Sequence, residues 1–303
     1  MAVPIEPVKQ GVLARMPAIP FAALSLLIIF FLYQAVGGAV TFLVMGGMAN
    51  EENVATARWL TLGGQLLFIL IPTFLLARGR GVGNRVFPVR NVRLSEILVT
   101  LVGILALQQV LQSYMLLQDQ IPLPDSIRDF VDPFKQMIEE TYRVLVTAHS
   151  GPEFLGVVLV VAVIPALAEE LLFRGLIQET LATSVGGLKA AVLTGLVFAA
   201  YHLSPFTFVP LAVLGIYFGY LVYRSRGLTL AIVAHFANNF LACLAVYLGV
   251  EEGFLMSAPE SELSFAVIAA NTALFGFLFV ASLVVFRRMT APEPGSVSGG
   301  EGE

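Results

Sequence analysis

The sequence Ala-Glu-Glu-Leu-Leu-Phe-Arg-Gly at residues 168–175 decides how the chain is organised. It places Glu169, Glu170 and Arg174 inside an apolar stretch that runs from about residue 154 to residue 182. Ionised side chains at membrane depth are energetically costly and usually face a partner or a water-filled cavity. This group of charges therefore predicts a functional site within an apolar helix.

The spacing of the charges predicts different environments for the two glutamates. On a helix, Glu170 and Arg174 are four residues apart and share a face, so they can form an ion pair. Glu169 is rotated by about 100° and does not share that face. We therefore expect a free carboxylate at Glu169. Because desolvation disfavours the ionised form of a lone carboxylate, such a group can act as a general base near neutral pH.

The composition indicates an all-α polytopic membrane protein. Hydrophobic residues make up 57% of the 303 residues and charged residues only 13%, which lies outside the range of soluble globular proteins. The single cysteine, Cys243, excludes an internal disulfide and a cysteine-based zinc site. Apolar runs of spanning length predict eight spans in one helical bundle. These runs cover approximately residues 21–48, 57–77, 95–117, 154–182, 188–203, 208–223, 228–249 and 264–286.

The charges in the loops predict the topology. Twelve of the 17 basic residues fall on one side of an eight-span bundle, and the alternate loops are acidic. The positive-inside rule then places both termini in the cytoplasm. We expect a cytoplasmic segment at residues 1–20, the bundle at residues 21–286 and a disordered cytoplasmic tail at residues 287–303, rich in Gly, Ser, Pro and Glu. The predicted location is the inner (plasma) membrane of a prokaryote.

An amphipathic helix is expected in the third loop. Asp132-Pro133 has the N-cap and N1 pattern of a helix start, and apolar and charged residues alternate at helical spacing over residues 133–148. Such a helix would lie at the outer membrane interface or simply cover the bundle; the sequence favours neither reading.

Further polar residues occur in later spans. His202 ends the predicted fifth span, one helical turn after Phe198, and His235 lies one turn before Asn239 in the seventh span. With a rise of ~1.5 Å per residue, Glu169, His202, His235 and Asn239 can meet at mid-depth or somewhat toward the cytoplasm. Asn238 is expected to point elsewhere on its helix.

This set of residues is suited to hydrolysis. A carboxylate and an imidazole can activate a water molecule, while a second imidazole and a carboxamide can donate hydrogen bonds to an oxyanion. The sequence suggests no serine or cysteine nucleophile. Alternatively, Glu169, His202 and His235 could be the three protein ligands of a catalytic Zn²⁺, so either no cofactor or Zn²⁺ is expected.

Three motifs resemble those of one protease family. Glu169-Glu170-x-x-x-Arg174, then Phe198-x-x-x-His202, then His235-x-x-x-Asn239 stand in this order on successive apolar helices. The pattern is similar to that of the CPBP family, which includes the CAAX prenyl endopeptidases of the Ras-converting type and the bacterial Abi or bacteriocin-processing proteins. The similarity covers a core of about residues 154–249.

The resemblance implies an intramembrane endopeptidase acting on membrane-associated protein or peptide substrates, with no nucleic-acid partner. In such an enzyme Glu169 and His202 activate water, and His235 and Asn239 stabilise the oxyanion. Glu170, Arg174 and Phe198 support the site structurally. The family implies either a glutamate-type or a metallo-type mechanism, and we favour the former. Farnesylated CAAX substrates are not expected in a prokaryotic inner membrane.

Two alternatives stay open at this stage. The protein could be a non-catalytic scaffold or immunity factor of the same family. It could also be a proton-coupled transporter, since buried carboxylates and histidines form proton relays and Pro165 could break the fourth span.

Overall fold

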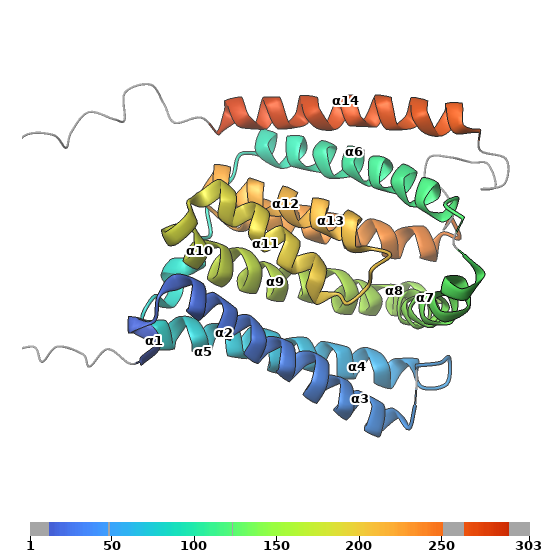
Figure 1. Cartoon of the computed structure of the whole chain (residues 1–303), viewed down its shortest axis with the longest axis horizontal. Helices are drawn as coiled ribbons and strands as arrows, with labels where there is room; N and C mark the ends of the chain where they lie inside the picture. The colour runs from blue at the N-terminus through green and yellow to red at the C-terminus, as the bar shows by residue number, and fades with distance from the viewer. Residues whose placement is uncertain (1–11, 48, 123, 251–263, 291–303) are drawn as a thin grey trace, which may run out of the picture.

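The computed structural model describes residues 12–47, 49–122, 124–250 and 264–290, which fold into a bundle of helices without strands (Figure 1). The first helices are α1 (Val12–Arg15), α2 (Ala18–Phe30), η1 (Phe31–Gly37), α3 (Gly38–Met45), α4 (Val54–Gly64), η2 (Gln65–Leu70), α5 (Ile71–Arg80), η3 (Gly83–Val86), α6 (Leu94–Asp119) and α7 (Asp125–Val146). The second half contains α8 (Gly151–Val157), η4 (Val158–Val163), α9 (Ile164–Glu170), η5 (Leu171–Gln178), α10 (Glu179–Val185), α11 (Gly187–Tyr201), α12 (Phe208–Ser225), α13 (Thr229–Tyr247) and α14 (Phe265–Met289).

Seven helices in the described ranges are long and apolar enough to cross a membrane. They cover Ala18–Met45, Val54–Arg80, Leu94–Asp119, Gly151–Val185, Phe208–Ser225, Thr229–Tyr247 and Phe265–Met289. The predicted fifth span is helix α11, which is apolar but only 15 residues long. The predicted all-α polytopic bundle is therefore confirmed.

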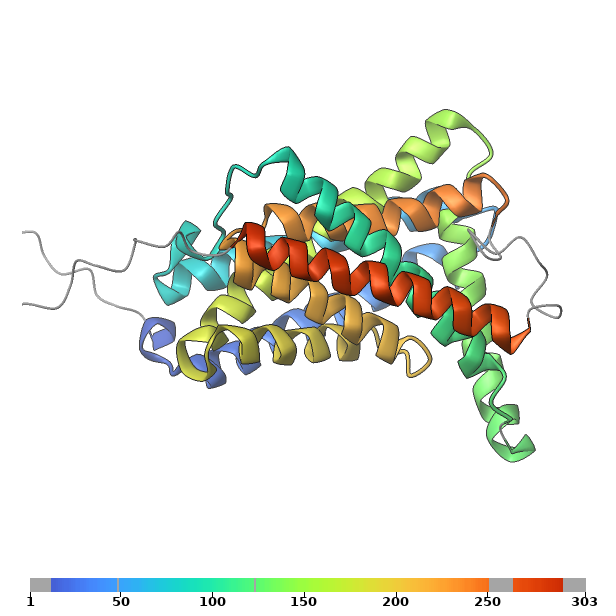
Figure 2. The same ribbon diagram turned by 90° about the horizontal axis from the view of Figure 1, so that it is seen from above.

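The helices form three layers. In Figure 1, α14 and α6 lie side by side at one edge, the helices from α2 to α5 form the opposite edge, and α8 to α13 lie between them. Figure 2 shows the same pairing of α14 with α6 from above. The three motif-bearing regions, α9 with η5, α11 and α13, thus lie in the middle layer, away from both outer edges.

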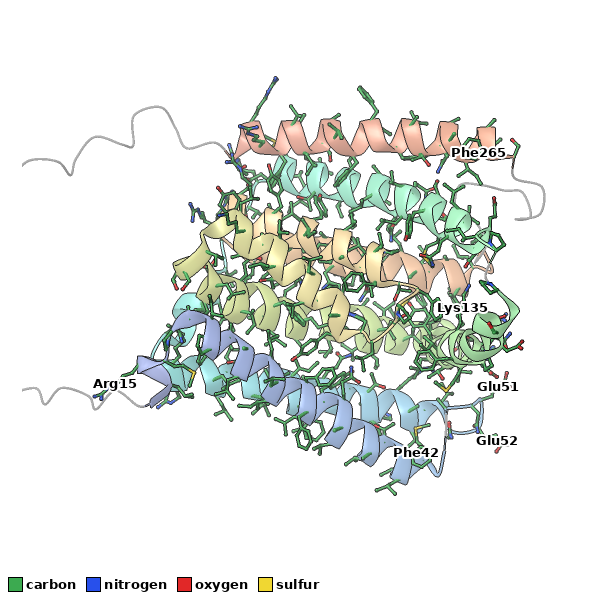
Figure 3. The ribbon with its side chains drawn as sticks, viewed as in Figure 1. Arg15, Phe42, Glu51, Glu52, Lys135 and Phe265 are labelled. Atoms are coloured by element: carbon green, nitrogen blue, oxygen red, sulfur yellow. The ribbon has the colours of Figure 1, made fainter. Side chains whose placement is uncertain are left out.

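Charged residues of the loops lie at the two ends of the bundle. Figure 3 shows Arg15 at the end where α14 also terminates, whereas Glu51, Glu52 and Lys135 lie at the opposite end. The alternation of loops along the chain thus agrees with the predicted one, and the cytoplasmic placement of the termini stays a prediction. The predicted acidic residues at 251–263 lie outside the described residues, as do residues 1–11 and 291–303 of the predicted terminal segments. Helix α14 continues to Met289, beyond the predicted start of the tail at residue 287.

Helix α7 corrects the predicted start of the amphipathic helix. It runs from Asp125 to Val146, so Pro133 lies inside the helix rather than at its first turn. A proline in a helix removes one backbone hydrogen bond, but the apolar periodicity of the sequence begins before residue 133 and continues after it. The amphipathic pattern of the whole segment thus determines where α7 begins, and the local Asp132-Pro133 pattern of a helix start does not.

The fourth span is continuous despite Pro165. A π-helical segment, η4, ends two residues before this proline, and a second one, η5, follows Glu170. Local widening of a helix can satisfy the backbone groups that a proline frees in a membrane. The prediction that Pro165 could break this span is therefore wrong.

Helices α11 and α12 approach each other closely at two glycines. A Cβ atom at Gly215 would lie 2.8 Å from the carbonyl oxygen of Gly195, and a Cβ atom at Gly195 would lie 2.5 Å from the backbone nitrogen of Ile216. Only glycine fits at both positions, because the atoms that a side chain would meet belong to the backbone. This contact fixes the distance between the helix that ends at His202 and its neighbour.

We predict that Gly195→Ala destabilises the protein by about 1–3 kcal/mol, because the added methyl group forces α11 and α12 apart. The measurement is the free energy of unfolding in detergent. Gly276→Ala in α14 is the matched control, since its Cβ atom would meet nothing within 4 Å. Equal stability of the two variants would contradict the close packing of α11 and α12.

Candidate active site

The helix that carries the first motif separates its two glutamates as the sequence predicts. Glu170, the last residue of α9, and Arg174 in η5 are both completely buried, whereas the side chain of Glu169 keeps 18% of its surface exposed. Arg174 Nη1 donates a hydrogen bond of 2.8 Å to Glu170 Oε1. The predicted ion pair is therefore present, and Glu169 lies outside it.

The Glu170–Arg174 pair is fixed from several sides. Arg174 Nη2 donates to the carbonyl oxygen of Gly215 (3.0 Å), and the guanidinium carbon lies 4.6 Å from the ring centroid of Phe198. A buried charge is stable only when its partner and hydrogen bonds replace the lost water. Phe198 thus makes a cation–π contact with the arginine, and its supporting role in the site stays a prediction.

Glu170 has a second partner that sequence spacing did not reveal. Its Oε1 atom lies 2.9 Å from His235 Nδ1, on a different helix. The ring of His235 also stacks on Phe218, with centroids 5.1 Å apart and planes inclined by 16°. A carboxylate at Nδ1 fixes the orientation of an imidazole and turns its Nε2 atom away from the pair. Nε2 lies 3.9 Å from Glu169 Oε2.

His202 is held by its own helix. Its Nδ1 atom lies 2.8 Å from the carbonyl oxygen of Phe198, one turn earlier in α11. Because a carbonyl oxygen only accepts hydrogen bonds, Nδ1 is the nitrogen that carries the proton. When the ring is neutral, Nε2 therefore carries no proton and can accept a hydrogen bond. His202 is the C-cap of α11, and Leu203 follows it in a left-handed conformation with φ 53°.

Asn239 is oriented by two hydrogen bonds. Its Nδ2 atom donates to the carbonyl oxygen of Val161 (3.0 Å), and its Oδ1 atom accepts a hydrogen bond from Asn238 Nδ2 (3.1 Å). Asn238 is itself fixed, because Gln108 donates to its Oδ1 atom (3.2 Å). The expectation that Asn238 points elsewhere is therefore wrong: it contacts Asn239 directly.

The four candidate catalytic residues meet in one cavity of about 530 Å³, which we call the catalytic cavity. Glu169, His202, His235 and Asn239 all line it, as does Phe198. Glu170 and Arg174 are not among the lining residues, but Glu170 contacts the lining residue His235 and Arg174 contacts the lining residue Phe198. The remaining lining residues are Thr61, Gln65, Ile138, Glu139, Tyr142, Leu145, Val160, Val161, Pro165, Ser204, Thr207, Leu211, Leu214, Phe218 and Asn238.

Helix α7 closes one side of the catalytic cavity, which the sequence did not reveal. Tyr142 and Leu145 belong to this helix, so the cavity reaches toward the end of the bundle opposite the chain termini. Arg58 in α4 holds the end of α7 through hydrogen bonds to the carbonyl oxygens of Leu145 (3.0 Å) and Thr147, and it forms an ion pair with Glu153 of α8 (2.7 Å).

A salt bridge fixes the earlier part of α7. Lys135 Nζ donates a hydrogen bond of 2.7 Å to Asp119 at the end of α6. This hydrogen bond raises the pKa of Lys135 above its ordinary value, so the ammonium group stays charged at neutral pH. Helix α7 is thus attached to the bundle through side chains of both α4 and α6.

Gln65 is another lining residue that the sequence did not single out. Its side chain is 5% exposed, and no residue of the described ranges donates a hydrogen bond to its Oε1 atom. The residue begins the π-helical segment η2, and such segments occur frequently at functional sites. The sequence pattern that could have indicated this residue is a polar glutamine inside the predicted span 57–77.

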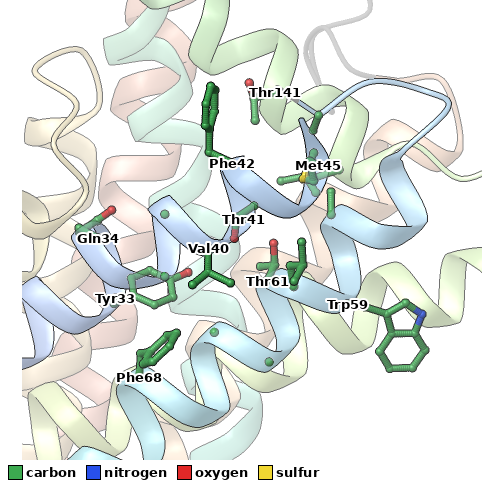
Figure 4. Close-up of a pocket in the computed structure, with 18 of the residues that line it drawn as sticks. Tyr33, Gln34, Val40, Thr41, Phe42, Met45, Trp59, Thr61, Phe68 and Thr141 are labelled. Carbon is green, nitrogen blue, oxygen red and sulfur yellow. The ribbon is translucent and has the colours of Figure 1, made fainter. Parts of the chain in front are cut away.

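A second cavity, of about 480 Å³, adjoins the catalytic cavity. It lies between η1–α3 and α4, with Thr141 of α7 at one end (Figure 4). Thr61 and Leu145 line both cavities. The two spaces therefore share a wall near the candidate catalytic residues.

The zinc alternative was tested against the geometry. In the part of the chain that the structure describes, no three or more His, Cys, Asp or Glu side chains are grouped so that they could hold a metal ion. Glu169, His202 and His235 line one cavity, but the three do not form a ligand set in this arrangement. We therefore derive no chemical step through a metal.

One family matches the region that carries the three motifs. Residues 151–241 match the family model described as type II CAAX prenyl endopeptidase, Rce1-like. This range contains every candidate site residue from Glu169 to Asn239, and it confirms the family predicted from the motifs. Residues 151–241 thus carry a domain of the CAAX-type intramembrane protease kind within a multi-pass membrane protein. No curated protein and no solved structure matches the chain.

We predict that Arg174→Met destabilises the protein by about 3–5 kcal/mol, because it leaves the buried carboxylate of Glu170 without its main counter-charge. The free energy of unfolding in detergent is the measurement. The double variant Glu170→Gln/Arg174→Met should recover most of this loss, since it removes both charges. If the double variant is as unstable as the single one, the ion pair is not the source of the effect.

Proposed function

We propose that the protein is an intramembrane endopeptidase that hydrolyses peptide bonds of membrane-associated protein substrates by a glutamate-type mechanism. The observation that carries this proposal is the convergence of Glu169, His202, His235 and Asn239, from three helical regions, on one cavity inside the bundle. Burying a polar side chain at membrane depth costs free energy, so four such residues that line one cavity indicate a functional site. The Rce1-like match of the same region supports a proteolytic function.

Water activation is assigned to Glu169 and His202. A water molecule between them can give one proton to the Glu169 carboxylate, while Nε2 of His202 accepts a hydrogen bond from the O–H group that the water keeps. The water oxygen attacks the carbonyl carbon and forms a tetrahedral intermediate with an oxyanion. When the C–N bond breaks, protonated Glu169 returns the proton to the leaving amine. The carboxylate is thus regenerated, and one water molecule is consumed.

His235 and Asn239 are assigned to the oxyanion. Asn239 Nδ2 uses one hydrogen for the carbonyl of Val161, which leaves its second hydrogen for a substrate oxygen. His235 Nε2 lines the same cavity and donates to the oxyanion when it carries a proton, while Nδ1 lies 2.9 Å from Glu170 Oε1 and holds the ring in place. Oriented donors of this kind stabilise the charge that develops in the transition state.

We predict that Glu169→Gln lowers the cleavage rate by about 10²–10⁴-fold, the contribution typical of a general base. The measurement compares membrane peptide fragments in wild-type and variant cells by mass spectrometry. Glu179→Gln is the matched control, because this half-buried glutamate lies on α10 away from the catalytic cavity. Fragments that disappear only in Glu169→Gln name the substrate. Identical fragments in all three strains would leave a non-catalytic scaffold as the better reading.

We further predict that cleavage persists after metal removal, because no metal ligand set is assembled among the described residues. The measurement is the cleavage rate of a Glu169-dependent substrate by purified protein after dialysis against a chelator, with elemental analysis of the same sample. Loss of activity that returns on addition of Zn²⁺ would overturn the glutamate-type mechanism and leave the endopeptidase function intact.

A further inference from the structure

The cavity that adjoins the catalytic cavity is an apolar groove, which we call the glycine groove. Its two walls are the segment 33–47 of η1 and α3 and the segment 57–68 of α4 and η2. Figure 4 shows Val40 and Phe42 on the first wall, Thr61 on the second and Phe68 near Tyr33. Most of the side chains that line it are apolar, so the groove suits a ligand that resides in the membrane.

Four helical glycines line this groove, and only two of them are explained by contacts within the protein. A Cβ atom at Gly37 would lie 3.1 Å from Phe68, and one at Gly64 would lie 3.6 Å from Tyr33. At Gly38 and Gly63, in contrast, a Cβ atom would meet nothing within 4 Å. Glycine inside a helix is less favourable than alanine by about 1 kcal/mol. Packing inside the bundle therefore does not account for these two residues.

Small residues on facing helices are what a third helix needs in order to pack closely. Helices in membranes associate where glycines allow their backbones to approach. Gly38 and Gly63 leave such a surface unoccupied, one on each wall. A lipid chain is thin and flexible, so it fits against larger side chains equally well and does not require glycine.

The groove leads directly to the candidate catalytic residues. Thr61 lies one helical turn before Gln65, and it lines the glycine groove and the catalytic cavity together. The hydroxyl of Tyr33, on the opposite wall, lies near the side chains of Gln65 and Glu169. A polypeptide seated in the groove would therefore have its next residues at the catalytic cavity.

Gln65 provides a second, independent indication that the ligand is a polypeptide. A helix must unwind before its backbone can be cleaved, and each N–H group freed at membrane depth needs an acceptor. Gln65 lines the catalytic cavity at this junction, and no described residue pairs with its buried Oε1 atom. Rotation about the terminal amide torsion, which is soft, can present that oxygen to an unwound segment.

We propose that the glycine groove is the docking site for an apolar, membrane-spanning helix of the substrate protein, and that Gln65 accepts a hydrogen bond from the segment that unwinds next to it. This assignment rests on the endopeptidase function proposed above. It defines the substrate class as proteins with a membrane-spanning helix that is cut close to the part seated in the groove.

The single tryptophan of the chain makes the docking directly measurable. Trp59 lies at the edge of the groove (Figure 4), and no other residue contributes indole fluorescence. The probe is a tryptophan-free helix of about 20 leucine and alanine residues with a brominated phenylalanine at its centre, in detergent micelles. We expect saturable quenching of Trp59 in the wild-type protein and in Glu169→Gln.

Gly63→Leu should raise the Kd of the probe helix at least tenfold, because the new side chain fills the groove without meeting a neighbour within 4 Å of its Cβ atom. Gly276→Leu in α14 is the matched control, with an equally open Cβ position, and should leave the Kd unchanged. Absence of saturable quenching, or equal Kd values in the two variants, would overturn the docking site. So would saturable quenching by a brominated phosphatidylcholine that the probe helix does not displace.

The role of Gln65 has its own readout. Gln65→Leu should slow cleavage of a Glu169-dependent substrate and leave the Kd of the probe helix unchanged, because the acceptor is needed only after unwinding. Gln109→Leu is the control, since Gln109 is also buried with an unpaired Oε1 atom but lines neither cavity. Equal cleavage rates would refute the role of Gln65. Saturable binding without any Glu169-dependent cleavage would refute the endopeptidase function alone, whereas such cleavage without saturable binding would refute the docking site alone.

Discussion

The buried carboxylate of Glu170 is the constraint on which the site depends. It has no exposed surface and lies within hydrogen-bonding distance of Arg174 on its own helix and of His235 on α13. Neither charge could be stable at this depth without the other. Through its contact with His235, Glu170 fixes the position of α9 relative to α13, and it orients an imidazole whose Nε2 atom lies 3.9 Å from Glu169 Oε2. The same side chain, Glu170, thus contributes to the stability of the bundle and to the orientation of a candidate catalytic histidine.

Much of this site could be predicted because it follows from spacing within single helices. The pairing of Glu170 with Arg174 is a four-residue contact, and so is the support of His202 by Phe198. Contacts between helices have no such signature in one sequence. The bond from Glu170 to His235 and the packing of Gly195 against Gly215 depend on how helices cross, which spacing does not determine.

Two errors have the same physical origin. Asp132-Pro133 has the local pattern of a helix start, but α7 continues through it. Asn238 is next to Asn239 and was expected to face away, yet it contacts the side chain of Asn239. In both cases the local rule is correct on average, and the tertiary environment outweighs it. Asn238 lines the same cavity as Asn239, and a hydrogen bond from Gln108 holds its side chain in this orientation.

The arrangement joins a polar catalytic cavity to an apolar groove across a shared wall. The glycine groove provides a surface without charged side chains, while the catalytic cavity collects the acid, imidazole and amide groups needed for hydrolysis. Helix α7 and its anchor Arg58 close the opposite side. A membrane-embedded substrate and a water molecule would thus reach the same point from environments of different polarity.

Glu169 and His235 face each other inside the bundle, with Oε2 of the glutamate 3.9 Å from Nε2 of the histidine. The most direct measurement is cross-linking of a Glu169→Cys/His235→Cys variant, in a Cys243→Ala background, with a short thiol-reactive reagent in native membranes. The account predicts an intramolecular cross-link between the two positions, and none when the second cysteine replaces Gly276 on α14. Absence of the first cross-link in folded protein, with Glu169→Cys reacting instead with a lipid-confined label, would contradict the account.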